Sequence, residues 1–280
     1  MKILIIGDLH GQIPVIPFCK FDAIIAPGDF CSDAPKKFMF QALQEHLNNK
    51  KSKTTWYDLA GKHAVTMVEK SLADGRAVLE HLNTIDTPVY VVPGNWDWTG
   101  KDKNRDPPGL KMPGKHLFKG LSNVINVNHS IKTCGDYQLI GCGNTSGPEY
   151  PQLDSELKRY TTRELRDKKN TYEKHLEIVR KLFLKARKPI IYLSHNVPYN
   201  TALDQIINPA SPRNGMHWGS VIGRKIIEEF QPIVAIGGHM HEHHTSCMLG
   251  KTTCINSGYG GNVSTVLEVK GTSVKISFNN

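Results

Sequence analysis

The chain has 280 residues, of which 39% are hydrophobic and 22% are charged, and its formal net charge at pH 7 is +9. It is long enough to bury a substantial core as one large domain, and it contains no internal repeat or low-complexity tract. No apolar stretch approaches the roughly 20 residues needed to span a bilayer, which excludes an integral membrane protein.

Apolar runs and helical periodicity predict an α/β sandwich. Five apolar runs predict strands that end immediately before Asp8, Asp29, Asn95, His195 and His239. The other expected elements are, in chain order, helices over 36–48 and 58–82, strands over 124–127 and 138–141, helices over 155–185 and 221–230, and strands over 252–256, 263–269 and 274–278. Since no helix separates the last strands, antiparallel pairing is expected at the C-terminal end of a second sheet.

The cysteines and the N-terminus indicate a cellular compartment. The six cysteines form no Cys-x-x-Cys pair, so free thiols are expected rather than a disulfide framework. Met1 leads directly into the first predicted strand, which leaves no room for a signal peptide. Both observations predict a cytoplasmic protein.

Each of the five predicted strands is followed at once by a residue that can bind a metal ion. The junctions end in Asp8-Leu-His10, Asp29, Asn95, His195 and His239-Met-His241. Ligands in α/β proteins collect beyond the carboxyl ends of the strands, so these residues are expected to converge in space. Taken singly, the Asp and Asn residues could be simple turn formers, but five aligned junctions favour one common site.

The residue types indicate what this site binds. Two Asp, one Asn and four His, with no Cys, form an oxygen and imidazole set suited to manganese, iron, zinc or cobalt. Seven ligands are too many for one tetrahedral ion, but with a bridging carboxylate they suffice for two ions about 3.5–4 Å apart. Such a pair can clamp both the attacking and the leaving oxygen of a phosphoryl displacement, so a phosphate ester is the expected substrate.

The histidines near residue 240 leave an ambiguity. His239, His241 and His243 lie on one side of an extended chain, so their spacing alone does not say which two bind. The preceding apolar run favours the first two.

The order and spacing of the five motifs resemble the calcineurin-like metallophosphoesterases, whose motifs are Asp-x-His, Gly-Asp, Gly-Asn-His-Asp/Glu, a lone His and Gly-His-x-His. The resemblance spans essentially the whole chain. Four segments also look like a narrower branch, the predicted phosphoesterases related to the cyclic-AMP phosphodiesterase Icc: residues 92–97, 194–204, 217–220 and 237–242. The resemblance implies a four-layer αββα sandwich of two mixed β-sheets flanked by helices, formed by residues 1–280 as a single domain.

The same resemblance implies the role of each ligand. Asp8, His10 and His241 would bind a first metal ion, Asn95, His195 and His239 would bind a second, and Asp29 would bridge them. Both ions would be divalent, with manganese foremost and iron, zinc, nickel or cobalt as alternatives. Catalysis would fall to Asp8, His10, Asp29, Asn95 and His195, with a metal-bridging hydroxide attacking phosphorus in line.

One residue departs from the family's pattern. Trp96 follows the predicted ligand Asn95, where most of the family has a His that is thought to protonate the leaving group or steady the transition state. An indole cannot give up a proton at neutral pH, and losing a general acid typically costs about 10²–10⁴ in rate when the leaving group is poor. We therefore expect phosphodiesters or activated leaving groups to be preferred over alkyl monoesters. Asp97, His129 and His217 are candidates to replace the acid.

Other residues are predicted to surround the substrate. Trp96, Asn196 and His217 are candidate substrate contacts. Residues 99–120, rich in Pro, Gly and Lys, predict an active-site loop. Residues 155–187 form a basic helical segment, with 12 Lys and Arg against 5 Asp and Glu between Glu156 and Lys188. A solvated helix explains this charge better than a nucleic-acid surface, because no interleaved aromatic residues accompany it.

These features favour a dinuclear metal-dependent phosphoesterase that acts chiefly on phosphodiesters, with a nucleotide among the candidate substrates. One alternative is a nuclease of the same superfamily, although nucleic acid is not the favoured partner. A second alternative is a catalytically weak metal-binding scaffold protein, an interpretation that the missing His keeps open. No membrane partner is expected, and homo-oligomerisation is left open.

Overall fold

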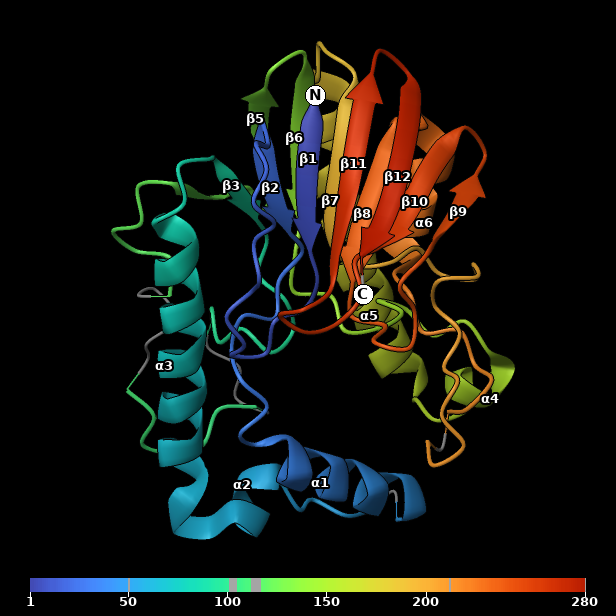
Figure 1. The fold of residues 1–280 in the computed structure, drawn as a ribbon. Coiled ribbons are helices and arrows are strands. Elements are labelled where there is room, and N and C mark those ends of the chain that lie inside the picture. The colour runs from blue at the N-terminus through green and yellow to red at the C-terminus, as the bar shows by residue number, and fades with distance from the viewer. Residues whose placement is uncertain (50, 101–104, 112–116, 212, 280) are drawn as a thin grey trace.

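Two six-stranded β-sheets pack face to face in the computed structural model, which describes residues 1–49, 51–100, 105–111, 117–211 and 213–279 (Figure 1). The first sheet has the order β12-β11-β1-β2-β3-β4. Its strands are β1 (Lys2–Ile6), β2 (Ala23–Ala26), β3 (Val89–Val91), β4 (Val124–Asn126), β11 (Ser264–Lys270) and β12 (Ser273–Asn279).

The second sheet has the order β5-β6-β7-β8-β10-β9. Its strands are β5 (Ile131–Cys134), β6 (Tyr137–Cys142), β7 (Ile190–Asn196), β8 (Val234–Gly238), β9 (Ser246–Leu249) and β10 (Thr252–Asn256). Strands β1, β2, β3 and β4 are parallel to one another, as are β6, β7, β8 and β10. The edge strands β5 and β9 pair antiparallel with β6 and β10, and β11 pairs antiparallel with both β1 and β12. Both sheets are therefore mixed, as predicted.

Helices cover the outer face of each sheet. Helix α3 (Ala64–Asn83) lies on the first sheet, and α5 (Thr162–Lys185) and α6 (Val221–Phe230) lie on the second (Figure 1). Strand β1 shows how the sequence builds these layers, because successive side chains of a strand point to opposite faces. Leu4 and Ile6 pack toward α3, whereas Ile3 and Ile5 pack between the sheets. The predicted αββα sandwich is confirmed.

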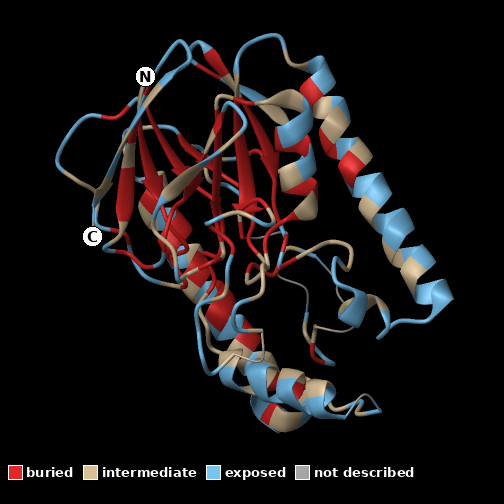
Figure 2. Cartoon of the chain, turned by 90° about the vertical axis from the view of Figure 1, so that its right-hand side faces the viewer, coloured by how far each residue is buried: buried red, intermediate tan, exposed pale blue. Residues whose placement is uncertain are grey.

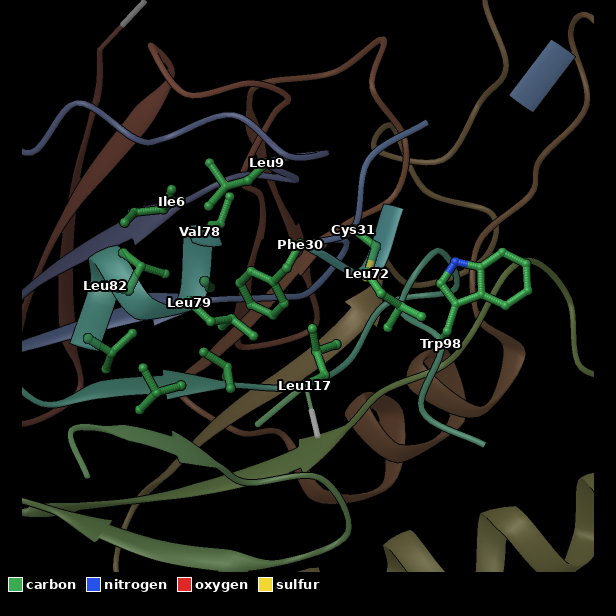
Figure 3. Close-up of a cluster of buried hydrophobic side chains, with 14 of the residues drawn as sticks. Ile6, Leu9, Phe30, Cys31, Leu72, Val78, Leu79, Leu82, Trp98 and Leu117 are labelled. Atoms are coloured by element: carbon green, nitrogen blue, oxygen red, sulfur yellow. The ribbon is translucent and has the colours of Figure 1, made fainter. Parts of the chain in front are cut away.

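The outer core of the first sheet is shown in Figure 3. Ile6, Leu9 and Phe30 come from the sheet and its connections, and Leu72, Val78, Leu79 and Leu82 come from α3. Figure 2 shows that the inner strands are almost continuously buried, while α5 exposes most of one face to solvent. Among the described helices, none combines the length and the apolar character needed to cross a bilayer.

The first two helices lie apart from these layers. Helices α1 (Lys36–Asn48) and α2 (Trp56–Ala60) project beyond the carboxyl ends of the β1 and β2 strands (Figure 1). Ala42 is the buried residue of α1, so most of this helix contributes little to the core. The helix is instead available to border whatever lies at that end of the sheets.

Two helices and two strands differ from the predictions. The helix expected over 58–82 is divided into α2, a 3-10 turn η1 (Gly61–His63) and α3. The helix expected over 155–185 is divided into α4 (Asp154–Leu157) and α5, because Thr161 and Glu164 form a capping box that starts α5 afresh. Strands β5 and β9 were not predicted, since edge strands that are mostly exposed lack an apolar run.

The C-terminal strands were assigned to the wrong sheet in part. The β9 and β10 strands do pair antiparallel at the edge of the second sheet. Strands β11 and β12 are also antiparallel to each other, but they join the first sheet, because β11 pairs with the whole length of β1. Pairing across such a sequence distance is decided by tertiary packing and leaves no local signal.

Candidate metal centre

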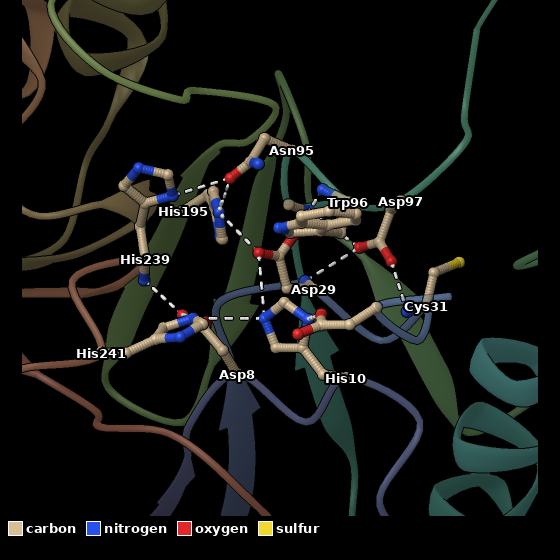
Figure 4. Close-up of polar contacts among 12 residues, drawn as sticks. Asp8, His10, Asp29, Cys31, Asn95, Trp96, Asp97, His195, His239 and His241 are labelled. Carbon is tan, nitrogen blue, oxygen red and sulfur yellow. Dashed lines mark hydrogen bonds and ion pairs between the residues drawn. The ribbon is translucent and has the colours of Figure 1, made fainter. Parts of the chain in front are cut away.

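The seven predicted metal ligands lie together at the carboxyl ends of five parallel strands (Figure 4). They come from the ends of β1 (Asp8 and His10), β2 (Asp29), β3 (Asn95), β7 (His195) and β8 (His239 and His241). This convergence is the one expected of parallel strands whose carboxyl ends share an edge.

The chain turns sharply to bring these side chains inward. His10, Asp29 and His239 have φ values of 44°, 55° and 68°, in the left-handed region that residues other than glycine seldom occupy. Gly28 and Gly94 lie against each other, and a Cβ on either would clash with the backbone or side chain of the other loop. Strained backbone of this kind gathers at functional sites when the surrounding structure enforces it.

One group of ligands surrounds the end of β1. Asp8, His10, Asp29 and His241 each offer a ligand atom, and these atoms lie within 4.8 Å of one another. His10 Nε2 is 3.2 Å from His241 Nε2 and 3.5 Å from Asp29 Oδ2. His241 Nε2 is in turn 3.5 Å from Asp8 Oδ2.

A second group shares Asp29 with the first. His195 Nε2 lies 3.4 Å from Asp29 Oδ2, and His239 completes the group. Asn95 belongs to it as well, since its Oδ1 is 2.8 Å from His195 Nε2 and 2.7 Å from His239 Nδ1. The two groups therefore meet at one carboxylate, at the residue that the sequence assigns as the bridge.

The polar atoms of the cluster fit a cation. Asp8 and Asp29 are fully buried, and Asp8 Oδ1 and Asp29 Oδ2 have no hydrogen-bond partner among the described residues. Leaving a buried acceptor unsatisfied costs about 1–3 kcal/mol, and more when it is charged. Divalent ions bound by this oxygen and imidazole set would satisfy both oxygens.

Neighbouring acceptors fix the orientation of two imidazoles. His195 Nδ1 donates to the Pro27 carbonyl at 2.9 Å, and His10 Nδ1 donates to Asp33. Each bond leaves Nε2 free to face the cluster, an arrangement typical of metal-binding histidines. Asp33 also contacts Lys36 Nζ at 2.6 Å. Sequence reasoning missed Asp33 and Pro27, because neither belongs to a recognisable motif.

A glycine-rich loop closes one side of the cluster. The Asp8 N–H donates to the Gly258 carbonyl at 3.1 Å, and the Asp8 carbonyl accepts from the Gly260 N–H at 2.8 Å. Between these contacts the Tyr259 ring stacks on the His241 imidazole, with 4.3 Å between ring centres. The loop over 258–261 was expected near the site, but sequence reasoning did not single out Tyr259, because no motif marks its contact with His241.

The predicted substitute acid Asp97 does not face the cluster. Its side chain is 1% exposed, and it accepts four backbone N–H bonds. Oδ2 accepts from Asp29 and Gly94 at 3.0 and 2.8 Å, and Oδ1 accepts from Phe30 and Cys31 at 2.9 and 3.0 Å. Asp97 therefore holds the loop that carries Asp29. Because both of its oxygens accept backbone N–H bonds, its carboxylate is not placed to transfer a proton to a substrate.

Of the three predicted substrate contacts, Trp96 is at the cluster. The backbone N–H of Trp96 donates to Asp29 Oδ1 at 2.6 Å. The centre of its indole ring is 5.9 Å from the centre of the His10 ring. Its carbonyl accepts from Arg105 Nη2 at 2.9 Å. The Arg105 guanidinium also stacks 3.8 Å over the Trp98 ring, so Arg105 contacts two residues of the segment that follows Asn95.

The other two predicted contacts are directed elsewhere. Asn196 is 1% exposed and donates through Nδ2 to the Trp218 carbonyl at 3.0 Å. It is the neighbour of His195 within β7, so the strand sends the two side chains to opposite faces. His217 contacts Asp204 Oδ1 through Nδ1 at 2.7 Å and does not line the cleft over the cluster. His129 follows β4, belongs to neither ligand group and does not line that cleft.

The predicted active-site loop over 99–120 is only partly within the described residues. Residues 101–104 and 112–116 lie outside them. Of the remainder, Thr99, Gly100 and Arg105 line a pocket beside Asn95 and Trp96.

Charge within the cluster is strongly coupled. Burial lowers the pKa of His195, but the charge and hydrogen bond of Asp29 outweigh burial and raise that pKa to about 9. Burial and the charge of His195 lower the pKa of His239 to about 3. Burial alone would raise the pKa of Asp29. The charge and hydrogen bond of His195 and the charge of His10 outweigh burial, and they lower this pKa to well below its usual value. The metal-free cluster thus holds an imidazolium–carboxylate pair beside a neutral imidazole.

Comparison with known proteins agrees with this geometry. Residues 1–243 match the family model of the calcineurin-like phosphoesterases. The chain belongs to this family. The membership predicted from the motifs is thereby confirmed, and it makes this phosphoesterase a metal-dependent phosphohydrolase that acts on phosphate esters.

Individual relatives share the fold more clearly than the sequence. This phosphoesterase is 27% identical over 262 residues to an uncharacterized protein of Methanocaldococcus jannaschii, which covers 91% of this chain and 87% of the relative. It resembles the crystal structure of TT1561 from Thermus thermophilus, with a TM-score of 0.53, 15% identity and coverage of 99% and 98% of the two chains. It also resembles phosphopantetheinyl hydrolase from Mycobacterium tuberculosis, with a TM-score of 0.51, 15% identity and coverage of 92% and 89%.

Proposed function

We propose that this phosphoesterase hydrolyses phosphodiesters with two divalent metal ions, held by Asp8, His10 and His241 on one side and by Asn95, His195 and His239 on the other. The observation that carries the proposal is the position of Asp29, whose Oδ2 lies 3.5 Å from His10 Nε2 and 3.4 Å from His195 Nε2. A carboxylate oxygen placed between two ligand groups is suited to bridging two cations.

The chain's own residues would prepare the site for a phosphate ester. Bound divalent ions would supply positive charge for the phosphoryl oxygens and lower the pKa of a nearby water molecule. His10 and His195 are held by Asp33 and Pro27 with Nε2 facing inward, so their orientation is set before any ion arrives. Asp8 and Asp29 are fully buried at the centre of the cluster, so a phosphate ester would meet two carboxylates unless cations lie between them, which couples substrate binding to metal uptake.

The preference for diesters rests on Trp96. This residue follows Asn95 directly, its indole is near His10, and it cannot serve as a general acid. The Asp97 carboxylate is occupied by backbone amides, and His129 and His217 do not line the cleft over the cluster, so none of these three candidates is placed to supply the missing acid. A leaving group that departs without protonation is therefore favoured, as is a diester over an alkyl monoester.

Hydrolysis of bis-p-nitrophenyl phosphate tests the proposal. Metal-stripped protein should be inactive, and added Mn²⁺ should restore turnover that exceeds turnover of the monoester p-nitrophenyl phosphate. Asp29→Ala should abolish it, whereas Asp136→Ala, at an exposed position, should not. Mass-spectrometric metal analysis after dialysis should find two ions per chain, with fewer in Asp29→Ala. One ion per chain at full activity would refute the dinuclear assignment.

The same measurements separate the alternatives. A scaffold protein would bind metal without turnover of any ester. A nuclease would cleave polynucleotides in a salt-sensitive manner and would prefer them to small diesters. Manganese as the native metal and a cytoplasmic location also stay proposals, which metal analysis and localisation of the protein in its own cells would test.

A further inference from the structure

The cleft over the metal cluster is larger than a phosphate group requires. Its volume is about 780 Å³, and Asp29, Asn95, His239 and His241 line only one end of it. Pockets of a few hundred to about 1,000 Å³ are the size that encloses a whole organic ligand. The remaining space is therefore available to the organic part of the ester.

Helix α1 forms one wall of this extension. Lys36, Phe40, Leu43 and Gln44 line the cleft, and their spacing of four, three and one residues places them on one face of the helix. Phe40 is 53% exposed, although it is a large apolar side chain. Because α1 lies beyond the sheets, this apolar face does not serve the core and is turned to the cleft instead.

A second segment adds apolar side chains to the cleft. Ile206 and Ile207 line it, and Ile207 is 61% exposed. Positive charge comes from Arg213, which also lines the cleft and whose guanidinium stacks 3.8 Å over the Trp218 ring. Exposed apolar side chains that line one cleft, beside positive charge, suit a ligand that is apolar along its length and anionic at one end.

We propose that the substrate is an amphiphilic phosphodiester, with an alkyl chain on one ester oxygen that lies between α1 and the segment 205–211. The inference rests on the proposed phosphodiesterase activity and names its substrate class. In the reaction, water forms a new bond to phosphorus, the bond from phosphorus to one alcohol oxygen breaks, and the released alcohol and a monoester share the protons of the water. The apolar chain determines affinity and takes no part in these bonds.

A chain-length series tests the inference. Methyl, butyl and octyl p-nitrophenyl phosphate share the leaving group and the charge and differ only in the chain that stays on phosphorus. A fully buried methylene is worth about fourfold in affinity, and partial burial in an open cleft reduces this to about twofold. Below the micellar concentration, kcat/KM should therefore rise about 100-fold from methyl to octyl, which is about twofold per methylene over seven methylenes.

Variants of the walls identify the subsite. Phe40→Ala with Ile207→Ala should flatten the dependence on chain length, so that kcat/KM for the octyl ester falls to about that for the methyl ester. Ile178→Ala with Leu184→Ala is the matched control, because these side chains on α5 are 42% and 62% exposed and do not line the cleft. The control pair should keep the full dependence.

The outcomes distinguish the two proposals. Equal kcat/KM across the series, or a higher value for thymidine 5′-p-nitrophenyl phosphate than for the octyl ester, would overturn the amphiphile in favour of a small or nucleoside ester. If no ester is hydrolysed, the proposed function fails, and calorimetric binding of octyl phosphate against methyl phosphate to the Mn²⁺-loaded protein still decides the subsite. The apolar subsite is supported if octyl phosphate binds more tightly than methyl phosphate and if this difference is lost in the Phe40→Ala, Ile207→Ala protein. Equal binding of the two phosphates by the unmutated protein refutes the subsite.

Discussion

Replacing Asp97 by Asn should destabilise the fold and loosen the metal centre, although the Asp97 side chain is not itself a candidate ligand. The carboxylate accepts N–H bonds from four residues, two at each oxygen: Asp29, Gly94, Phe30 and Cys31. An amide keeps one oxygen, and its NH₂ group would face two N–H donors. Two of the four bonds would be lost, and two buried donors would have no acceptor.

The expected magnitude follows from this count. An orphaned buried donor costs about 1–3 kcal/mol, so the two would lower the free energy of unfolding by about 2–6 kcal/mol. Burial and the negative charge of Asp29 raise the pKa of Asp97, so part of its charge is already unfavourable in the folded state. Removing that charge offsets some of the loss, and we expect a value of about 2–3 kcal/mol, at the lower end of the range.

Urea unfolding of the metal-free protein, followed by circular dichroism, measures this loss. The matched control is Asp86→Asn, at an exposed position, for which a change within about 0.5 kcal/mol is expected. A Mn²⁺ titration of the same proteins should show weaker binding for Asp97→Asn, because Asp29 would no longer be fixed. If Asp97→Asn matched the control in both measurements, the role assigned to the four amide bonds would be refuted.

Three further predictions concern the cluster itself. Trp96→His should raise kcat/KM for an alkyl monoester by about 100-fold relative to the diester, since it restores a group that can protonate a poor leaving group. Phosphate release measures the monoester rate, and an unchanged ratio would contradict the claim that the indole of Trp96 disfavours monoesters. Because the folded-state pKa of His195 is raised to about 9, its stabilising contribution in the metal-free protein is fully present below its unfolded pKa of about 6.5 and is lost as pH rises through 9. Mn²⁺ must displace this proton, so calorimetry in two buffers at pH 7.5 should detect proton release of about one per chain, and none would refute the pairing of His195 with Asp29. Asp33→Asn should weaken Mn²⁺ binding about 10- to 100-fold by freeing His10 to rotate, with Asp136→Asn as the unaffected control.

The convergence of the seven candidate ligands was predictable because a local sequence pattern marks each of them. An apolar run that ends in Asp, Asn or His marks both the strand and the end of it that faces the site, and parallel strands bring such ends together. Asn196 shows the limit of this reasoning. Strand β7 continues through Asn196, so alternation sends its side chain away from His195, and the sequence does not mark where the strand stops.

The residues that hold the ligands could not be predicted in the same way. Asp33 faces His10 across a loop, and Asp97 receives the amides of a segment almost 70 residues earlier in the chain. Asp97 looked like a candidate acid because it lies next to Trp96 in sequence. Its function depends on which way the buried carboxylate points, which only the packed loops determine.

The sequence by itself was enough to predict the family, the layered αββα fold and the candidate residues of the metal centre, since these depend on the period of apolar residues and on side-chain chemistry at strand ends. The tertiary structure decided that β11 and β12 join the first sheet, that the Asp97 carboxylate accepts the amides of the loop that carries Asp29, and that one face of α1 lines a cleft rather than a core. Each of these depends on contacts between segments far apart in the chain. Such contacts are fixed by which surfaces pack together, and local sequence does not encode their outcome.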